Sequence, residues 1–329
     1  MRLRRADPSR PGWRRRRRGR GFGYHDERGR PITDAEALGR IRALVIPPAW
    51  TDVWINPDPR GHIQAVGTDA AGRRQYRYHD VWRAKRDASK FDHVLDVAAR
   101  LPELRERVDE DLGKRGYPRE RVLAAAVRLL DDGLFRVGGE SYATVDASGE
   151  PTYGLATLRR DHVTVRGATI EFRYPAKGGV ERAQRIVDDK LAPLVRGLLR
   201  RDDDDVELLA YRDGRDWRDV RSADVNGYLK SVTGCEISAK DFRTWHATVL
   251  AAVLLADAPS GSATARKRAV ARVMREVAEY LGNTPTVARN SYVDPRVVDL
   301  FHAGSTAKVG GDADHRDAAE QAVRELLRV

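Results

Sequence analysis

The sequence is poor in cysteine, with Cys235 as the single example among 329 residues. One cysteine excludes an internal disulfide framework and a zinc site built from several cysteines, and it is typical of a reducing compartment. Long hydrophobic runs are also lacking. The longest nearly unbroken run, residues 247–256, is too short to cross a bilayer, which requires about 20 apolar residues. We therefore predict a protein without a membrane-spanning segment.

Motifs for common cofactors are absent as well. The chain contains no Walker loop and no GxGxxG motif, the glycine-rich loops that bind nucleotide phosphates. Its eight histidines are scattered, and none forms an HExxH motif or pairs with Cys235 at the spacing of metal ligands. ATP, NAD and a catalytic metal thus have no recognisable site, and we expect no cofactor and no metal.

Positive charge is concentrated at the N-terminus. The net charge of the chain is +11, but residues 1–20 hold ten arginines and one aspartate, which leaves only +2 for the rest. Residues 1–23 combine these arginines with proline and glycine and contain little that could pack. We expect them to form a flexible arginine-rich arm, which either binds phosphates or is simply solvated.

The remaining sequence changes its pattern near residue 90. Residues 24–90 contain short strand candidates bounded by glycine and proline, such as residues 53–55. Residues 91–329 show mostly helical spacing of apolar residues, interrupted by strand-like sequence at 143–188 with a hairpin expected around Arg166 and Gly167. We therefore predict an α+β protein with a small β-rich N-terminal domain and a larger, mainly α-helical domain.

A basic and aromatic segment closes the β-rich region. In GTDAAGRRQYRY, residues 67–78, arginines alternate with tyrosines beside a glycine turn. Guanidinium groups pair with phosphate oxygens, while amide and phenol groups donate to phosphates or base edges. A solvated face with core aromatics would give the same pattern, but we predict nucleic-acid contacts. The candidate residues are Arg73, Arg74, Gln75, Tyr76 and Tyr78.

Three cations of the helical region lie next to glycines, a tight turn or the start of a helix. Arg136 precedes two glycines, Lys177 lies in the tight turn PAKGG, and Arg243 lies near the start of an apolar helix. Later in the chain, Thr284 and Pro285 have the spacing of an N-cap and the first helical residue. Taken singly, each cation is expected to be a surface charge, and Tyr292 an ordinary buried tyrosine.

Taken together, these motifs resemble the type IB DNA topoisomerases, closest to the short branch of bacteria and poxviruses. The resemblance covers residues 22–302 in the same order, and 67–78 resembles that branch's N-terminal DNA clamp. It is carried by LFRVG at 134–138, YGLATLRRDHV at 153–163, KDFRTW at 240–245 and LGNTP…SY at 281–292. It implies a catalytic domain of the tyrosine recombinase and type IB topoisomerase kind, which clamps duplex DNA. It also implies relaxation of positive and negative supercoils through a transient single-strand break, without ATP or metal.

The resemblance also implies roles for individual residues. Tyr292 matches the nucleophile that forms a 3′-phosphotyrosyl link. Arg136 and Arg243 match the arginines that hold the non-bridging oxygens of the scissile phosphate, and Lys177 matches the general acid that protonates the departing 5′-oxygen. Phosphoryl transfer needs such groups, because charge gathers on the equatorial oxygens in the transition state.

Asn283 is the one departure from the family pattern, which has histidine at this position. An asparagine amide also donates a hydrogen bond, so it preserves that role, but it has no acid–base function near neutral pH. Tyr142 is a further candidate DNA contact.

Two alternatives remain open on the sequence. A tyrosine recombinase or integrase uses a similar residue set, but usually has histidine where this chain has Lys240, and an all-helical N-terminal domain. A non-catalytic DNA-binding protein would explain the arginines at 1–20 and the segment at 67–78, but not the order of the other motifs. We expect a monomer that acts on double-stranded DNA in the cytoplasm of a bacterium, at the nucleoid, and does not bind membranes.

Overall fold

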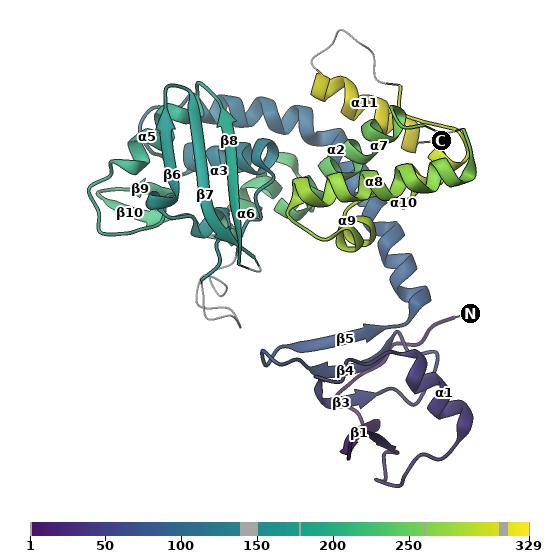
Figure 1. Cartoon of the computed structure of the whole chain (residues 1–329). Helices are drawn as coiled ribbons and strands as arrows, with labels where there is room; N and C mark the ends of the chain where they lie inside the picture. The colour runs from purple at the N-terminus through teal and green to yellow at the C-terminus, as the bar shows by residue number, and fades with distance from the viewer. Residues whose placement is uncertain (1, 139–150, 178, 260, 309–314, 329) are drawn as a thin grey trace. The chain divides into compact units, whose positions relative to one another are not determined.

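The structure is a computed structural model that describes residues 2–138, 151–177, 179–259, 261–308 and 315–328. The chain forms two compact units, Met1–Phe91 and Asp92–Val329 (Figure 1). The boundary lies inside helix α2 (Asp80–Leu112), close to the division after residue 90 that the sequence suggested.

The first unit is built on a five-stranded antiparallel sheet with the strand order β2-β1-β3-β4-β5. Helix α1 (Ala35–Ala43) contributes Ile41 to a buried cluster with Val53, Ile55 and Ala65 of the sheet. Because successive side chains of a strand point to opposite faces, Trp54 lies on the other face. The strands are β1 (Trp13–Arg18), β2 (Gly21–His25), β3 (Thr51–Ile55), β4 (Ile63–Thr68) and β5 (Arg74–Tyr78).

The N-terminal residues contradict the prediction of a flexible arm over residues 1–23. Strand β1 pairs with both β2 and β3, so the run of five arginines lies inside the sheet and not outside the fold. Before it, Gly12 packs against the ring of Trp54, whose Nε1 donates to the Arg10 carbonyl at 3.0 Å. Residues 4–12 therefore cover the tryptophan face of the sheet.

Arg15 explains why an arginine run can form a strand here. Its guanidinium donates to the carbonyl oxygens of Ile46 at 3.3 Å, Pro47 at 3.1 Å and Trp50 at 2.5 Å, and lies 4.1 Å from the Phe22 ring centre. A long alkyl stem packs on apolar surface while the charged end finds acceptors. Composition alone hides this, because the acceptors are contributed by residues 31–35 positions away.

The second unit contains two small antiparallel sheets. The larger has the order β6-β7-β8, and β6 pairs with β7 across the turn at Arg166 and Gly167, which confirms the predicted hairpin. Strand β7 carries Ile170 and Phe172 into the core. The strands are β6 (Val163–Arg166), β7 (Thr169–Ala176), β8 (Val180–Val187), and the separate pair β9 (Ala210–Asp213) and β10 (Asp216–Asp219).

Helices make up most of the second unit. Helix α9 begins as predicted, with Thr284 as its N-cap and Pro285 in its first turn. Besides the C-terminal part of α2, the helices are α3 (Arg119–Gly133), α5 (Leu191–Leu199), α6 (Ser222–Thr233), α7 (Ala239–Ala256), α8 (Ala263–Leu281), α9 (Pro285–Ser291), α10 (Pro295–His302) and α11 (His315–Leu327), with short 3-10 turns at Leu155–Thr157 and Arg160–His162.

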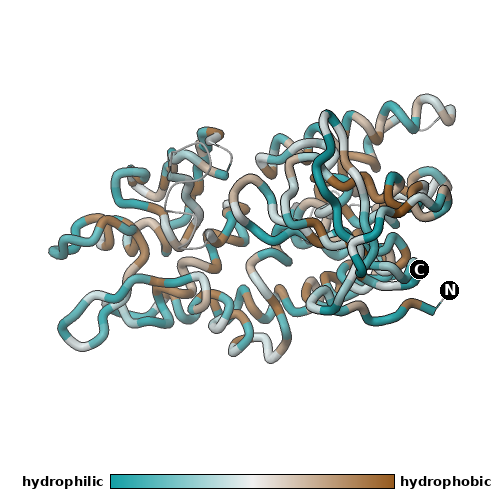
Figure 2. The backbone as a smooth tube through the Cα atoms, turned by 90° about the horizontal axis from the view of Figure 1, so that it is seen from below, coloured by the Kyte–Doolittle hydropathy of each residue, from teal (hydrophilic) through white to brown (hydrophobic). Residues whose placement is uncertain are grey.

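Amphipathic helices surround one main core. Brown and teal alternate along the helices in Figure 2, as expected where one face of a helix is buried and the other is solvated. Phe135, Phe172, Phe242 and Trp245 are among its largest fully buried side chains. Within the described ranges, we find no helix with the length and apolar character needed to span a membrane. The predicted α+β class, with a β-rich first unit and a mainly helical second unit, is confirmed.

A buried ionic network attaches α11 to the rest of the second unit. Asp131 of α3 accepts hydrogen bonds from Arg105 Nε at 2.8 Å and from Arg316 of α11, and its Oδ1 lies 2.9 Å from His246 Nε2 of α7. Burial raises the pKa of the Asp131 carboxyl, but His246, Arg316 and Arg105 outweigh this and hold its pKa well below the usual range. The ionised carboxylate thus ties α2, α3, α7 and α11 together.

We predict that Asp131→Asn lowers the free energy of unfolding at pH 7 by roughly 3–5 kcal/mol, because it leaves buried cations without their counter-charge. Asp131 stabilises the fold above its unfolded-state pKa of about 3.9, and this contribution declines as the pH falls below that value. The difference between parent and variant should therefore shrink by about 1.4 kcal/mol per pH unit below pH 4. Urea unfolding between pH 3 and 7 measures it.

Asp317→Asn is the matched control, because Asp317 pairs with the same Arg105 at 3.1 Å but its side chain is 69% exposed. An exposed pair contributes at most about 1 kcal/mol. A difference for Asp131→Asn that stays constant from pH 5 to pH 3 would show that its pKa is not lowered by folding.

Candidate active site

Four of the five predicted catalytic residues line one pocket of the second unit. Arg136, Lys177, Arg243 and Tyr292 surround a cavity of about 500 Å³. Arg136 follows α3 and Lys177 follows β7. Arg243 lies in α7, and Tyr292 follows α9. Residues far apart in the sequence are therefore brought together around a space that a ligand group could enter.

The backbone of Tyr292 is held at the end of α9. Its amide donates to the Ala288 carbonyl at 3.0 Å, and its carbonyl accepts from Thr248 Oγ1 at 3.2 Å. The same Thr248 oxygen accepts from the amide of Asp294 at 3.1 Å, and Asp294 caps the start of α10. Thr248, buried on α7, thus fixes the turn that carries the tyrosine.

Arg243 is the most buried cation of the pocket, with 3% of its surface exposed. Its Nη1 donates to the Leu134 carbonyl, and its Nη2 donates to the Leu281 carbonyl at 2.7 Å. Its Nε is buried without a hydrogen-bond partner among the residues that the structure describes. Burial, reinforced by the charge of Arg136, lowers the pKa of Arg243 to about 10, so the group remains protonated at neutral pH.

The phenol of Tyr292 is placed among these cations. The Arg243 guanidinium lies 5.4 Å from the centre of its ring. Burial raises the pKa of Tyr292, but the charge and hydrogen bond of Arg243, followed by the charges of Arg136 and Lys240, outweigh burial and lower it below its ordinary value. These cations therefore make the phenol easier to ionise to the phenolate, which is its nucleophilic form.

Asn283 lies beside Arg136. Its Oδ1 accepts from Arg136 Nη2 at 2.6 Å, and the same nitrogen lies 3.3 Å from the Gly282 carbonyl. The Asn283 Nδ2 is buried and donates to no group within the described ranges. Gly282, at φ +61°, ends α8, and Thr284 starts α9, so Asn283 stands in a short fixed link between two helices. An amide donor is thus left over next to Arg136.

Two glycines fix the backbone of the Arg136 segment. The amides of Leu155 and Ala156 donate to the carbonyls of Arg136 and Val137, both at 2.8 Å. A Cβ atom on Gly154 would lie 2.3 Å from Gly138 Cα, which itself has φ +76°. The two backbones therefore touch directly, which neither position would permit with a side chain.

Lys177 is the exposed member of the set. It directly follows β7, in a turn closed by a hydrogen bond from the Gly179 amide to the Ala176 carbonyl at 3.0 Å. The side chain is exposed, and no ion pair of Lys177 is found in the described part of the chain. The side chain is therefore available to a ligand that enters the pocket.

Lys240 and Thr248 also belong to this site, although no role was predicted for either of them. Lys240 lines the pocket one turn before Arg243, and it contributes to the lowered pKa of Tyr292. Thr248 holds the backbone of Tyr292. Lys240 belongs to the KDFRTW motif and could have been found from it, whereas a threonine inside a hydrophobic helix gave no signal.

The predicted nucleic-acid contacts lie on β5 of the first unit and its preceding turn. Tyr76 and Tyr78 are 41% and 36% exposed, and their rings stack at 6.0 Å. Arg73 pairs with Asp69 at 3.0 Å, and Gln75 Nε2 donates to the same carboxylate at 2.9 Å. Arg74 is exposed and has no ion pair in the described residues. Tyr142 lies outside the described residues.

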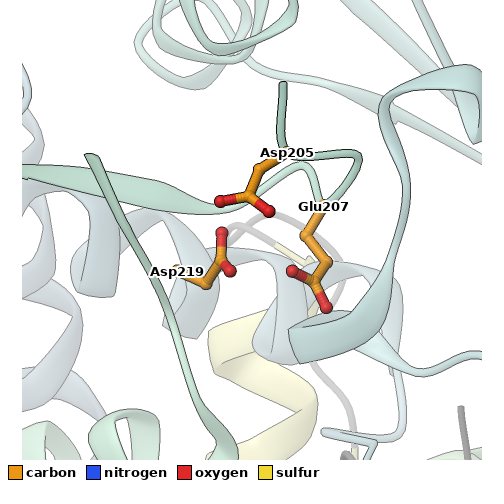
Figure 3. A group of neighbouring side chains, drawn as sticks. All are labelled: Asp205, Glu207 and Asp219. Atoms are coloured by element: carbon orange, nitrogen blue, oxygen red, sulfur yellow. The ribbon is translucent and has the colours of Figure 1, made fainter. Parts of the chain in front are cut away.

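One acidic group in the described residues has the geometry to hold a metal ion. Figure 3 shows the carboxylates of Asp205, Glu207 and Asp219 near one another. Arg201 lies 3.7 Å from Asp219, and Arg221 lies 3.4 Å from Asp219 and 3.9 Å from Glu207. Burial, with the Asp219 carboxyl, raises the pKa of Glu207 to about 7. Arginines thus offset this charge, and none of the three acids lines the pocket.

Comparisons with known proteins agree over most of the chain. Residues 79–302 match the family described as "Eukaryotic DNA topoisomerase I, catalytic core", and residues 21–69 match "Bacterial DNA topoisomerase IB, N-terminal domain". A protein of Acanthamoeba polyphaga mimivirus named "DNA topoisomerase 1B" is 30% identical over an alignment of 288 residues, which covers 84% of this chain and 83% of that protein. The first match includes all five predicted catalytic positions.

Proposed function

The chain belongs to the type IB DNA topoisomerases, and we propose that Tyr292 is the residue with which it breaks one strand of duplex DNA. As a member of this family, it is a DNA topoisomerase, which decides against the two alternatives left open by the sequence. One observation carries the proposal for the residues. Tyr292, Arg136, Arg243 and Lys177 line a single pocket although they are distributed over more than 150 positions.

In the cleavage step that we propose, the Tyr292 phenolate attacks the phosphorus of the scissile phosphodiester. A bond forms between Tyr292 Oη and phosphorus, the bond to the 5′-oxygen breaks, and the DNA is left with a 3′-phosphotyrosyl link. An alkoxide is a poor leaving group, so Lys177 supplies the proton that turns the 5′-oxygen into a hydroxyl. The lowered pKa of Tyr292 supports its role as the nucleophile.

The other groups stabilise the charge on the non-bridging oxygens. Arg136, Arg243 and the Nδ2 of Asn283 are the proposed donors, and the unsatisfied Nδ2 and the buried Arg243 Nε support this. One preorganised donor of this kind lowers the activation barrier by roughly 2.7–4 kcal/mol. Charged and polar side chains then stabilise the negative charge that other phosphoryl-transfer enzymes neutralise with metal ions.

Resealing is the reverse reaction. The 5′-hydroxyl attacks the phosphotyrosine, Lys177 takes back the proton, and Tyr292 leaves. Because one phosphodiester is exchanged for another, no ATP is needed, and supercoils of either sign relax while the strand is open. We propose that Arg74, Tyr76 and Tyr78 contact the DNA, and that the enzyme acts as a monomer on the bacterial nucleoid.

The proposal predicts that the protein relaxes positively and negatively supercoiled plasmid without ATP and in the presence of EDTA. Tyr292→Phe should abolish relaxation and the covalent adduct, because the attacking oxygen is missing, while duplex binding stays within about twofold of the parent. Agarose gels measure relaxation, and denaturing gels detect the adduct. Relaxation by Tyr292→Phe would assign the nucleophile to another residue.

Lys177→Ala should slow single-turnover cleavage by roughly 10²–10⁴-fold, the usual contribution of a general acid, with little loss of binding. A duplex with sulfur in place of the 5′-bridging oxygen has a leaving group that needs no proton, so it should restore the rate of this variant. Equal defects on the oxygen and sulfur duplexes would instead assign Lys177 to phosphate binding.

Asn283→Ala should lose roughly 10²–10³-fold in cleavage rate, the contribution of one donor to the oxyanion. Asn283→His should retain much of the activity, because histidine also donates. Asn283→Asp should be slower than Asn283→Ala, because it sets a negative charge against the phosphate. Single-turnover cleavage compares the three variants, and an Asn283→Ala enzyme as fast as the parent would leave Asn283 with a purely structural place between α8 and α9.

A further inference from the structure

The arginines of β1 divide between the two faces of the N-terminal sheet. In an antiparallel pair, residues directly opposite each other point to the same face. Arg14 is opposite Trp54, Trp54 is opposite Val66, and Val66 is opposite Tyr76. Arg14 therefore shares its face with Tyr76, and the alternation along the strand places Arg16 and Arg18 on the same face.

The opposite face receives Arg15 and Arg17. Arg15 is used by the fold, since its guanidinium donates to three carbonyls and covers Phe22. Arg17 is opposite Phe22 in the pairing of β1 with β2 and is exposed. The alternation thus places Arg15, which the fold uses, and the exposed Arg17 on the face opposite to Tyr76.

Arg14, Arg16 and Arg18 have no visible structural task. All three are exposed, and none of their side chains makes a hydrogen bond or an ion pair in the described residues. The neighbouring strand does not shield Arg16 and Arg18, because they are opposite Gly23 and Gly21, whereas Arg14 is opposite His25. Three unpaired cations held side by side repel one another, a cost that an anionic partner removes.

The spacing of the three suits a regular polyanion. Alternate residues of an antiparallel strand lie about 6.8 Å apart, so Arg14 and Arg18 are separated by roughly 14 Å. One strand of duplex DNA carries a phosphate per ~3.4 Å along the helix axis. The three arginines therefore span about four nucleotide steps.

Two rows of side chains on this face are suited to DNA. One is the β1 row, Arg14, Arg16 and Arg18, and the other is the β5 row, Arg74, Tyr76 and Tyr78. The strand order places β3 and β4 between them. Trp54 and Val66, in the middle of the face, are buried and pack with Ala6. The exposed parts of the face thus include the β1 row and the β5 row, on either side of this buried middle.

We propose that Arg14, Arg16 and Arg18 form a phosphate-binding ladder, which holds the backbone of duplex DNA on the same sheet face as Tyr76 and Tyr78. The proposal rests on the proposed function, in which β5 contacts DNA. It replaces the general idea of a basic tail with three named residues, and it predicts that the adjacent Arg17 takes no part.

The test compares neighbouring arginines on opposite faces. Full-length proteins that all carry Tyr292→Phe, which prevents cleavage, bind a 30-base-pair duplex at 50–200 mM KCl. Each lost phosphate contact reduces the slope of log K against log[salt] by about 0.9. The loss of affinity between 50 and 200 mM KCl then becomes about 3.5-fold smaller than in the parent. Arg16→Gln should show this change, and Arg17→Gln should not. The triple variant Arg14→Gln, Arg16→Gln, Arg18→Gln should reduce the slope by about 2.7. Its loss of affinity between 50 and 200 mM KCl should then be roughly 40-fold smaller than that of the parent.

Equal changes for Arg16→Gln and Arg17→Gln would overturn the ladder in favour of diffuse attraction, and an unchanged slope for the triple variant would overturn it outright. Circular dichroism confirms that each variant is folded. The triple variant with Tyr292 intact should still form the covalent adduct at saturating enzyme. A parent protein that forms no adduct would refute the proposed function without affecting the salt comparison, so the two failures are distinguishable.

Discussion

The geometry of the proposed active site depends on the hydrogen bonds of the buried Arg243 guanidinium. It donates to the carbonyl of Leu134, two residues before Arg136, and to the carbonyl of Leu281, two residues before Asn283. It also lies against the ring of Tyr292. One side chain therefore joins the ends of α3 and α8 to α7 and the tyrosine. Burying a charge is costly unless it is well hydrogen-bonded, so the chain cannot move these helix ends apart without exposing an unsatisfied cation.

Helix C-termini make this cluster of cations possible. The last carbonyls of a helix have no partner within the helix and carry partial negative charge. Leu281 and Gly282, at the end of α8, accept from Arg243 and Arg136, while Arg182 donates to the carbonyl of Tyr280 at 2.8 Å. These dipoles offset the repulsion among the arginines, and no carboxylate among the described residues lines the pocket. An acid would pair with the arginines and compete with phosphate, whereas a carbonyl orients them and leaves their net charge available.

Local signals in the sequence predicted the helices, the hairpin at Arg166 and the cap at Thr284, because turn and cap chemistry is decided within a few residues. The catalytic positions were predicted from motif order and not from periodicity, which by itself described Tyr292 as a core residue. The residues of strand β1 were wrongly predicted to belong to a flexible arm. Its arginines are kept in the sheet by carbonyls of Ile46, Pro47 and Trp50 and by the ring of Phe22, and sequence composition carries no information about such distant acceptors. The role of Thr248 could not be predicted either, because its partners Tyr292 and Asp294 are distant in the sequence.

Asn283 shows how the site depends on its own hydrogen bonds. Its Oδ1 accepts from Arg136 at 2.6 Å, which leaves Nδ2 as a donor of fixed direction. A neutral imidazole can likewise accept with one nitrogen and donate with the other, but a protonated one has two donors and no acceptor. Protonation would therefore break the contact with Arg136 and add a third positive charge beside Arg136 and Arg243. An asparagine has neither problem at any physiological pH. Compared with the histidine that the family resemblance implies, Asn283 is thus a donor that does not titrate. In the reaction that we propose, Tyr292 and Lys177 are then the groups that exchange protons.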